Sequence, residues 1–389
     1  MKEIRSLTTL RALAAFLVFM YHYAWMFPPQ TRGGAAAAAL PLLPLWRSGQ
    51  VGVSIFFVLS GFLITRLYYD RFAAGQGALR LYFVKRVARI WPLFLFFAAI
   101  QHAVLLLRGT PPSADWLVTC TMSQGFFRDL RYAGLPTAWS LTIEENFYAV
   151  APAVYIALAA LALGRGPGLR PWRPAVTARF TAVLAGAAAI LFGVAAGALL
   201  LARALGWTFG GFMGDLPHVM HATLGGRFPE FALGIACAFV HRQGRLPTVL
   251  RGGRATAVAL ASAAGIAGCL WWKDAALAAG SAAQNYAGSY AVALLTGLLI
   301  LALTREESRA SRALSGGWAV YLGRISYGFY LLQLTVIMEP LLALTDPLGP
   351  WRLPALCLLM NLVCAACYEL IEKPARRGLV ARFGGAAAA

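Results

Sequence analysis

The segment LTTLRALAAFLVFMYHYAWMF (residues 7–27) decides the fold class, because it is a long apolar run that carries a cation and an imidazole. Arg11 and His22 are eleven residues apart, and eleven steps of about 100° bring a helix back to within about 20° of its starting direction. Both side chains are therefore expected on one helix face, roughly 16 Å apart along the axis. Ionisable residues are costly to keep inside a membrane span, so they indicate a functional site.

Composition extends this interpretation to the whole chain. Of its 389 residues, 60% are hydrophobic and 13% are charged, whereas soluble domains are about 45–50% apolar and about 25% charged. Hydropathy and breaker residues predict an all-α polytopic membrane protein, a bundle of about ten transmembrane helices in one domain over residues 1–377, with a short cytoplasmic tail at 378–389. The expected spans are residues 7–27, 50–69, 83–107, 138–163, 179–205, 226–242, 254–272, 284–304, 318–342 and 352–372.

The loop cations set the expected orientation. Loops on the side of the N-terminus carry 23 Lys and Arg residues, and the opposite side carries nine. The positive-inside rule then places both termini in the cytoplasm, and it accounts for most of the basic residues without a nucleic-acid partner. The apolar segment at residues 116–127 is too short for a further span and is expected to be re-entrant or interfacial. The first span lacks a small-x-small cleavage site, so we expect it to be retained.

Two arginines enter the third expected span from its cytoplasmic side, in YFVKRVARIWP (residues 82–92). Arg86 and Arg89 are three residues apart and share a helix face, with Lys85 beside them. Paired guanidinium groups suit bidentate capture of phosphate. The alternative is an ordinary basic flank whose side chains reach toward lipid headgroups, and spacing alone leaves both readings open.

A carboxylate opens the fourth expected span from its outer side, in AWSLTIEENFYAVAP (residues 138–152). Glu144 and His22 should each lie within two turns of the outer end of their helices, and so at similar depth. A carboxylate there can orient an imidazole or take part in proton transfer, unless it simply faces water. The string Asp215 to His221 is a weak metal-binding pattern, so we expect no metal.

Taken together, these segments resemble the acyltransferase-3 family of integral membrane acyltransferases. The R-x10-H signature of that family is met by Arg11 and His22, and its R-x-x-R signature by Arg86 and Arg89. Five further blocks are similar in order: VGVSIFFVLSGFLITR (51–66), WSLTIEENFY (139–148), RFPEFALGI (227–235), ISYGFYLLQ (325–333) and YELIEKPARR (368–377).

The resemblance implies an enzyme of a bacterial-type inner membrane that moves an acyl group, often acetyl, from acyl-CoA to a hydroxyl of the acceptor. It implies that His22 is the essential base and places Glu144 on the matched acid. Donor-binding roles fall on Arg11, Lys85, Arg86 and Arg89. Acceptor-site or supporting roles fall on Ser60, Trp139, Tyr148, Glu230 and Gln333.

One departure from the family pattern concerns Gln333, which stands where many relatives have a histidine. An amide can form hydrogen bonds but cannot shuttle a proton, so a mechanism with two histidines is not expected. No esterase-like extension follows the last block, so we expect transfer in one stage. Whether transfer is direct or passes through an acyl-histidine stays open.

The nature of the acceptor stays open between two classes. We favour a carbohydrate-type acceptor such as a cell-surface glycan, and the alternative is a glycosylated secondary metabolite such as a macrolide. A transporter or flippase without chemistry is a rival of another class. It predicts inverted repeats or paired broken helices, which the hydropathy pattern does not indicate.

Overall fold

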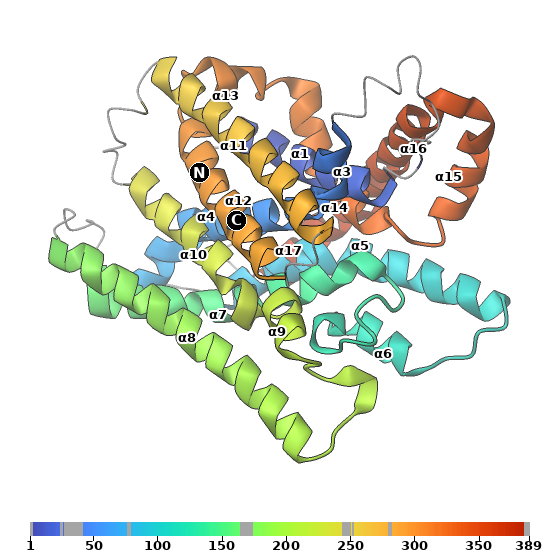
Figure 1. The fold of residues 1–389 in the computed structure, drawn as a ribbon, viewed down its shortest axis with the longest axis horizontal. Helices are drawn as coiled ribbons and strands as arrows, with labels where there is room; N and C mark the ends of the chain where they lie inside the picture. Colours follow the sequence, from blue (N-terminus) through green and yellow to red (C-terminus); the bar gives the residue numbers. More distant parts are fainter. Residues whose placement is uncertain are drawn as a thin grey trace. The chain divides into compact units, whose positions relative to one another are not determined.

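The regular structure of this protein is helical (Figure 1). The computed structural model describes residues 3–23, 26, 42–75, 79–163, 174–242, 250, 253–278 and 282–384. Within these ranges no strand forms, and a single isolated bridge joins Phe127 to Phe212. The all-α membrane fold expected from the sequence is therefore confirmed.

Seven helical segments of the described residues are long and apolar enough to cross a bilayer. They cover Gly49–Ala73, Leu79–Leu107, Pro136–Ala162, Ala175–Ala204, Gly253–Ala275, Tyr286–Leu303 and Met338–Phe383. The number of ten spans and the cytoplasmic placement of the termini stay predictions.

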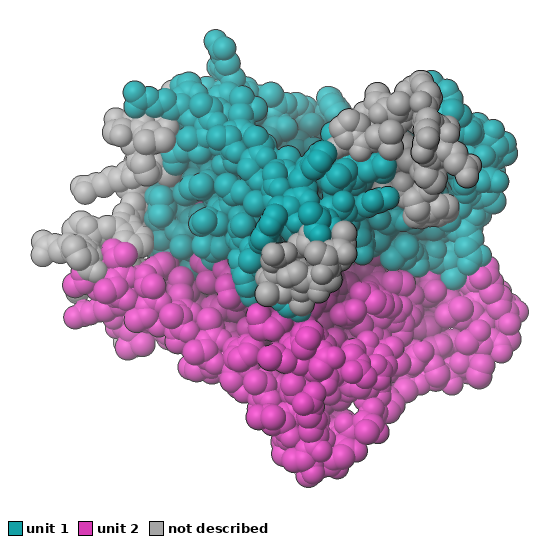
Figure 2. Space-filling view, viewed as in Figure 1, with its two compact units in different colours: residues 1–61, 233–366 teal, residues 62–232, 367–389 magenta. Residues whose placement is uncertain are grey.

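The chain divides into two compact units, coloured separately in Figure 2. Unit 1 comprises residues 1–61 and 233–366, and unit 2 comprises residues 62–232 and 367–389. Helices within unit 1 are α1 (Arg5–Tyr23), α3 (Leu43–Arg47), α11 (Gly253–Ala278), α12 (Ala282–Leu303), α13 (Arg309–Ala313), α14 (Gly317–Leu332) and α15 (Met338–Thr345). Helices within unit 2 are α5 (Leu79–Leu107), α6 (Ala114–Cys120), α7 (Trp139–Leu158), α8 (Pro174–Ala204), α9 (Leu216–Ala222) and α17 (Lys373–Phe383). The boundary passes through α4 (Gly52–Ala73), α10 (Leu224–Arg242) and α16 (Arg352–Cys367).

In unit 1, α1 packs closely along α14. A Cβ placed on Gly323 of α14 would collide with the Thr8 carbonyl of α1, so only glycine permits this approach. Ser6 and Thr9 of α1 donate hydrogen bonds to the carbonyls of Leu303 (3.0 Å) and Leu314 (2.6 Å). Small residues and side-chain hydrogen bonds of this kind hold membrane helices together, because lipid provides no hydrophobic driving force between them. Helix α1 is thereby fixed against the helix that ends at Gln333.

The expected span at residues 318–342 is wrong as one continuous helix. Helix α14 ends at Leu332 and α15 begins at Met338. Gln333 leaves the helical conformation at φ −57° and ψ 138°, and Leu334 follows in the left-handed region at φ 62°. The side chain of Gln333 donates to the carbonyl of Phe329 at 3.2 Å, which satisfies one of the acceptors that a helix end leaves open.

In unit 2, long helices combine with an irregular loop region. Helix α17 packs on α5, and α7 continues into a π-helical turn at Ala159–Leu163 before α8. The apolar segment at residues 116–127 forms only the seven-residue α6 and a short turn at Gln124–Phe126, so it is indeed too short to span a membrane. At the C-terminal end, residues 368–372 form a second π-helical segment, and helix then continues through Phe383.

Candidate active site

His22 lies in the last turn of α1, and its imidazole contacts the residue that follows α14. Its Nδ1 lies 2.7 Å from Oε1 of Gln333, whose side chain is fully buried. The neighbouring rings of Tyr21 and Tyr23 lie 5.3 and 6.4 Å from the imidazole, centroid to centroid. Nε2 makes no hydrogen bond to any residue that the structure describes in unit 1. The imidazole is therefore anchored through one nitrogen.

Unit 1 also contains two other residues to which the sequence analysis assigned roles. Arg11 is half-buried on α1, and Ser60 is buried in α4 with 5% of its surface exposed. Their roles as donor-binding and supporting residues stay predictions.

Arg86 is buried among tyrosines near the start of α5. Only 7% of its surface is exposed, and Nη2 donates to the hydroxyl of Tyr68 at 3.3 Å. The guanidinium carbon lies 5.4 Å from the ring centroid of Tyr68 and 5.6 Å from that of Tyr148, within the range of cation–π attraction. Tyr82 packs edge-on against Tyr68 and donates to the backbone carbonyl of Tyr148 at 2.9 Å. We call Tyr68, Tyr82 and Tyr148 the tyrosine cage.

The surroundings of Arg86 differ from those of an ordinary lipid-facing flank, and the phosphate-binding role of the arginine pair stays a prediction. A lipid-facing flank would expose its guanidinium groups, whereas Arg86 is enclosed by protein, and Arg89 and Lys85 are half-buried. The buried Nε of Arg86 has no hydrogen-bond partner among the described residues. An unsatisfied buried donor is costly, so this atom has capacity for an anionic group.

Glu144 belongs to the same surroundings through Tyr148. The hydroxyl of Tyr148, one helical turn further along α7, donates a short hydrogen bond to Glu144. The adjacent Glu145 lies near the indole of Trp91 on α5, and its buried Oε1 has no hydrogen-bond partner among the described residues. The expected pairing of Glu144 with His22 joins residues of different units and stays a prediction.

Glu230 forms a closed ion pair. Its side chain is fully buried, and its two oxygens accept from Nε and Nη2 of Arg227 at 2.7 and 3.0 Å. The two side chains therefore neutralise each other. Next to it, Phe231 stacks on Phe147 with 4.2 Å between ring centroids. This arrangement gives Glu230 a supporting position within unit 2.

The residues of the weak metal pattern make separate contacts. Asp215 caps α9 by accepting from the backbone N–H of His218 at 2.7 Å, and Nε2 of His218 lies 3.0 Å from the carbonyl of Gly125. Burial and, after it, the nearby Arg131 lower the pKa of His218. His221 stacks on Trp139 with 4.6 Å between centroids. The structure thus brings Trp139 together with a histidine that the sequence analysis did not connect to it.

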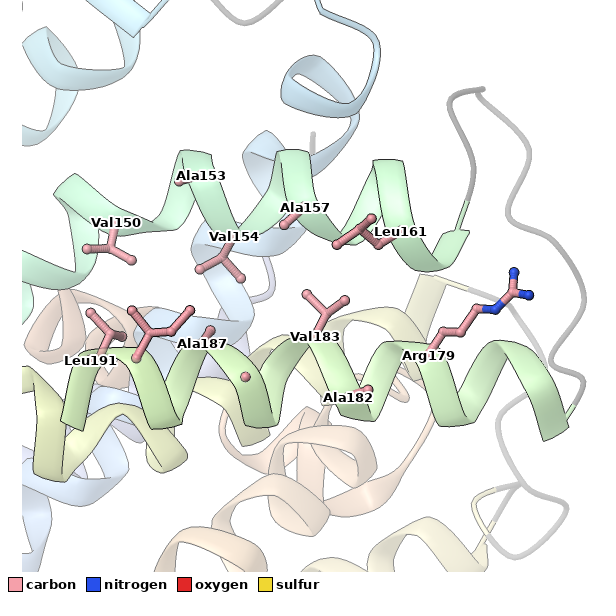
Figure 3. Close-up of a pocket in the computed structure, with 12 residues that line it drawn as sticks. Val150, Ala153, Val154, Ala157, Leu161, Arg179, Ala182, Val183, Ala187 and Leu191 are labelled. Atoms are coloured by element: carbon pink, nitrogen blue, oxygen red, sulfur yellow. The ribbon is translucent and has the colours of Figure 1, made fainter. Parts of the chain in front are cut away.

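An apolar groove of about 590 Å³ lies between α7 and α8 (Figure 3). Val150, Val154 and Leu161 line one side, Val183 and Leu191 line the other, and Arg179 lies at one end. Apart from Arg179, the described residues that line the groove are apolar and include no acid or base. The groove can hold a hydrocarbon chain, but its lining cannot move a proton.

Comparison with known families settles the relationship of the chain. A family model described as an acyltransferase domain matches residues 4–369. The chain belongs to the acyltransferase-3 family. It is thereby an acyltransferase-type membrane protein, and the resemblance read from its motifs is confirmed. No solved structure shows a significant match.

The chain is also similar to individual relatives, two of which are named O-acetyltransferases. It is 25% identical to the peptidoglycan O-acetyltransferase OatA of Listeria monocytogenes over 99% of its own length and 58% of that protein. It is 26% identical to a putative O-acetyltransferase of Staphylococcus aureus strain COL over 41% of its own length and 26% of that protein. An uncharacterized protein of Haemophilus influenzae is 30% identical over 27% of this chain and 48% of that protein. The chain therefore spans no more than about three fifths of these relatives.

The sequence analysis missed part of the arginine site. Tyr82 precedes Arg86 by four residues and so shares its helix face, which was a usable signal. Tyr68 comes from another helix, so no spacing could connect it to Arg86. The sequence analysis also singled out no role for Glu145, which the structure buries near Trp91.

Proposed function

We propose that this protein transfers an acyl group, acetyl in the simplest case, from acyl-CoA to a hydroxyl of a cell-surface glycan. Membership of the acyltransferase-3 family supports acyl transfer. The name of the Listeria relative, matched along nearly the whole chain, supports a carbohydrate acceptor. The proposed setting is a bacterial-type inner membrane, crossed several times by the apolar helices.

The observation that carries the proposal is the state of His22. Its Nδ1 is engaged by Gln333, and Nε2 has no hydrogen-bond partner among the described residues of its unit. A general base needs one unprotonated nitrogen that a hydroxyl can reach. In neutral His22, donation from Nδ1 to Gln333 would leave Nε2 as that unprotonated nitrogen. The place of His22 in the last turn of α1 leaves it half-buried rather than sealed.

The reaction follows from this base. Nε2 of His22 takes the proton from the acceptor hydroxyl as its oxygen attacks the thioester carbonyl. The C–S bond then breaks, and an ester and the CoA thiolate leave. The thiolate takes the proton from the imidazolium, so the base is restored and no other reactant is consumed.

The donor side rests on the basic residues at the start of α5. Arg86, Arg89 and Lys85 bind the phosphates of CoA, with Arg11 as a further cation on α1. The buried Nε of Arg86, which has no protein partner in the described residues, is the donor that an anionic ligand would satisfy. The tyrosine cage keeps the guanidinium in place by cation–π attraction while leaving this hydrogen bond available.

The remaining predicted residues have supporting roles in the proposal. Glu144, held by Tyr148, stabilises positive charge that develops during proton transfer. The stacked pair of Trp139 and His221 offers an aromatic surface suited to a sugar ring. Ser60 supports α4, and Glu230 keeps Arg227 neutralised within unit 2. The chemistry needs no metal.

The proposal is tested with the purified full chain in phospholipid vesicles. Radiolabelled acetyl-CoA and peptidoglycan glycan strands are supplied, and alkali-labile label on the glycan is counted. We expect label transfer that depends on protein and acetyl-CoA, with acetyl phosphate inactive as donor. Transfer only to a macrolide supplied in parallel would overturn the glycan assignment. Absence of both ester formation and acyl-CoA turnover would overturn the enzyme assignment.

A further inference from the structure

The contact between His22 and Gln333 joins residues that are 311 positions apart in the chain. Gln333 immediately follows α14, and its side chain is fully buried against α1. Because it has left the helical conformation, it can reach across to α1 instead of continuing along α14. A buried amide that is placed by such a turn can form only the hydrogen bonds that its surroundings offer.

The orientation of the Gln333 amide is fixed by backbone carbonyls. Its Nε2 lies 3.2 Å from the carbonyl oxygen of Phe329 and 3.4 Å from that of Ala15. Carbonyl oxygens only accept hydrogen bonds, so the NH₂ group must face them. Oε1 is then the atom directed at His22, and a rotation of the amide by 180° would set oxygen against oxygen at both carbonyls.

The backbone after Gln333 strengthens this arrangement. Leu334 holds a positive φ of 62°, a conformation that costs an ordinary L-residue about 1–2 kcal/mol and needs surrounding contacts to maintain it. Its N–H lies 3.5 Å from the hydroxyl of Tyr23, the residue after His22. The turn that carries Gln333 and the end of α1 that carries His22 are therefore tied together at two points.

The orientation of the amide determines the proton on His22. Oε1 of an amide only accepts, so the nitrogen that faces it must carry the proton. In neutral imidazole the second nitrogen then holds the lone pair. We propose that Gln333 is a positioning residue that selects the Nδ1–H tautomer of His22 and so directs the basic lone pair of Nε2 to the acceptor hydroxyl.

This inference rests on the proposed function for its consequence in catalysis, but its structural content does not. Glutamine does not titrate, so the selection holds at any pH at which His22 is neutral. A histidine at position 333 could either donate or accept and would select a tautomer only through its own partners. Gln333 thus selects the tautomer of His22 by its fixed geometry, whereas a titratable partner would select it only in one of its own protonation states.

The test reads the tautomer directly, by ¹⁵N NMR of the full chain labelled at its five histidines, with His22→Gln used to assign the signal of His22. We expect a protonated Nδ1 and an unprotonated Nε2 in the wild-type protein near neutral pH. A protonated Nε2 with a bare Nδ1 would overturn the proposal, and this readout needs no variant at position 333 and no activity.

Variants at Gln333 connect the tautomer to turnover. Gln333→Met keeps the volume but removes the acceptor, and we expect mixed tautomers and a fall in kcat of about 10²-fold with little change in KM for acetyl-CoA. Gln333→Glu, with its carboxyl protonated on the oxygen that faces the two carbonyls, keeps an acceptor oxygen toward Nδ1 and should retain the tautomer and recover most of kcat. Gln101→Met, which replaces a buried glutamine of α5, is the matched control and should leave the His22 signal unchanged.

The NMR measurement and the turnover measurements distinguish failure of the proposed function from failure of the proposed role of Gln333. If His22→Ala keeps full turnover, the proposed base is wrong, whereas the tautomer of His22 can still be as proposed. If the wild-type tautomer is as expected but Gln333→Met keeps full kcat, the positioning role in catalysis is overturned.

Discussion

The two polar sites of this protein are held in opposite ways. In unit 1, Nδ1 of His22 faces the accepting oxygen of a neutral amide whose own orientation is fixed by carbonyls. In unit 2, Arg86 is surrounded by aromatic rings and keeps a buried Nε without a partner among the described residues. A group that must present one atom in one protonation state needs a directional contact. A group that must bind an anion needs a place that leaves its donors available.

A third buried contact, between Arg227 and Glu230, provides the reference of a fully compensated pair. Arg227→Ala would leave a fully buried carboxylate without its bidentate partner, so we expect a loss of about 3–5 kcal/mol of stability. Thermal unfolding in detergent micelles measures this loss. The double variant Arg227→Leu with Glu230→Leu should recover most of it. An unchanged unfolding midpoint for the single variant would show that this pair does not stabilise unit 2.

The anion-binding half of the comparison is tested at Arg86. Arg86→Gln keeps much of the volume but removes the charge, and hydrogen bonds to charged groups contribute about 1.5–3 kcal/mol. We therefore expect KM for acetyl-CoA to rise about tenfold to hundredfold with a smaller effect on kcat. Arg80→Gln, an exposed position on the same helix, is the control. Equal effects of the two variants would remove the tyrosine cage from donor binding.

The link between the tyrosine cage and the acid is tested at Tyr148. Tyr148→Phe removes the hydroxyl that donates to Glu144 but keeps the ring beside Arg86. We expect kcat to fall about threefold to tenfold, while KM for acetyl-CoA stays near that of the wild type. Tyr155→Phe, seven residues along α7, removes a hydroxyl that is bonded to Thr65 at 3.1 Å and serves as the control. A change confined to KM would assign Tyr148 to the donor site alone.

The smallest expected effect concerns His218, whose pKa is lowered by burial. Its lowered pKa means that the unfolded state binds more protons, so stability falls as pH drops through the ordinary histidine value of about 6.5. His218→Gln can still donate to the carbonyl of Gly125 and should lose less stability on acidification. Unfolding midpoints at pH 7.5 and pH 5 compare the two proteins. Identical pH dependence would mean that His218 does not couple folding to protons.

Hydropathy predicted the long helices because each is apolar along its whole length. It failed at residues 318–342, where the run LLQLTVIM (331–338) contains no proline or glycine to signal a break. The chain turns there because Gln333 forms hydrogen bonds with residues of α1. Such tertiary contacts cannot be read from the local sequence. For the same reason the sequence motifs point to His22 and Arg86 but not to the residues that contact them. Gln333 was noticed as a departure, whereas its contact with His22 was not foreseen.

The central claim is that His22 is the base of an acyl transfer, and the most direct test is the rate of labelled acetyl transfer by His22→Ala in vesicles. His241→Ala, at the end of α10, controls for the loss of a histidine. The account predicts that His22→Ala loses about 10²-fold or more of the wild-type rate while His241→Ala keeps it. Transfer by His22→Ala at a rate near that of the wild type would contradict the account.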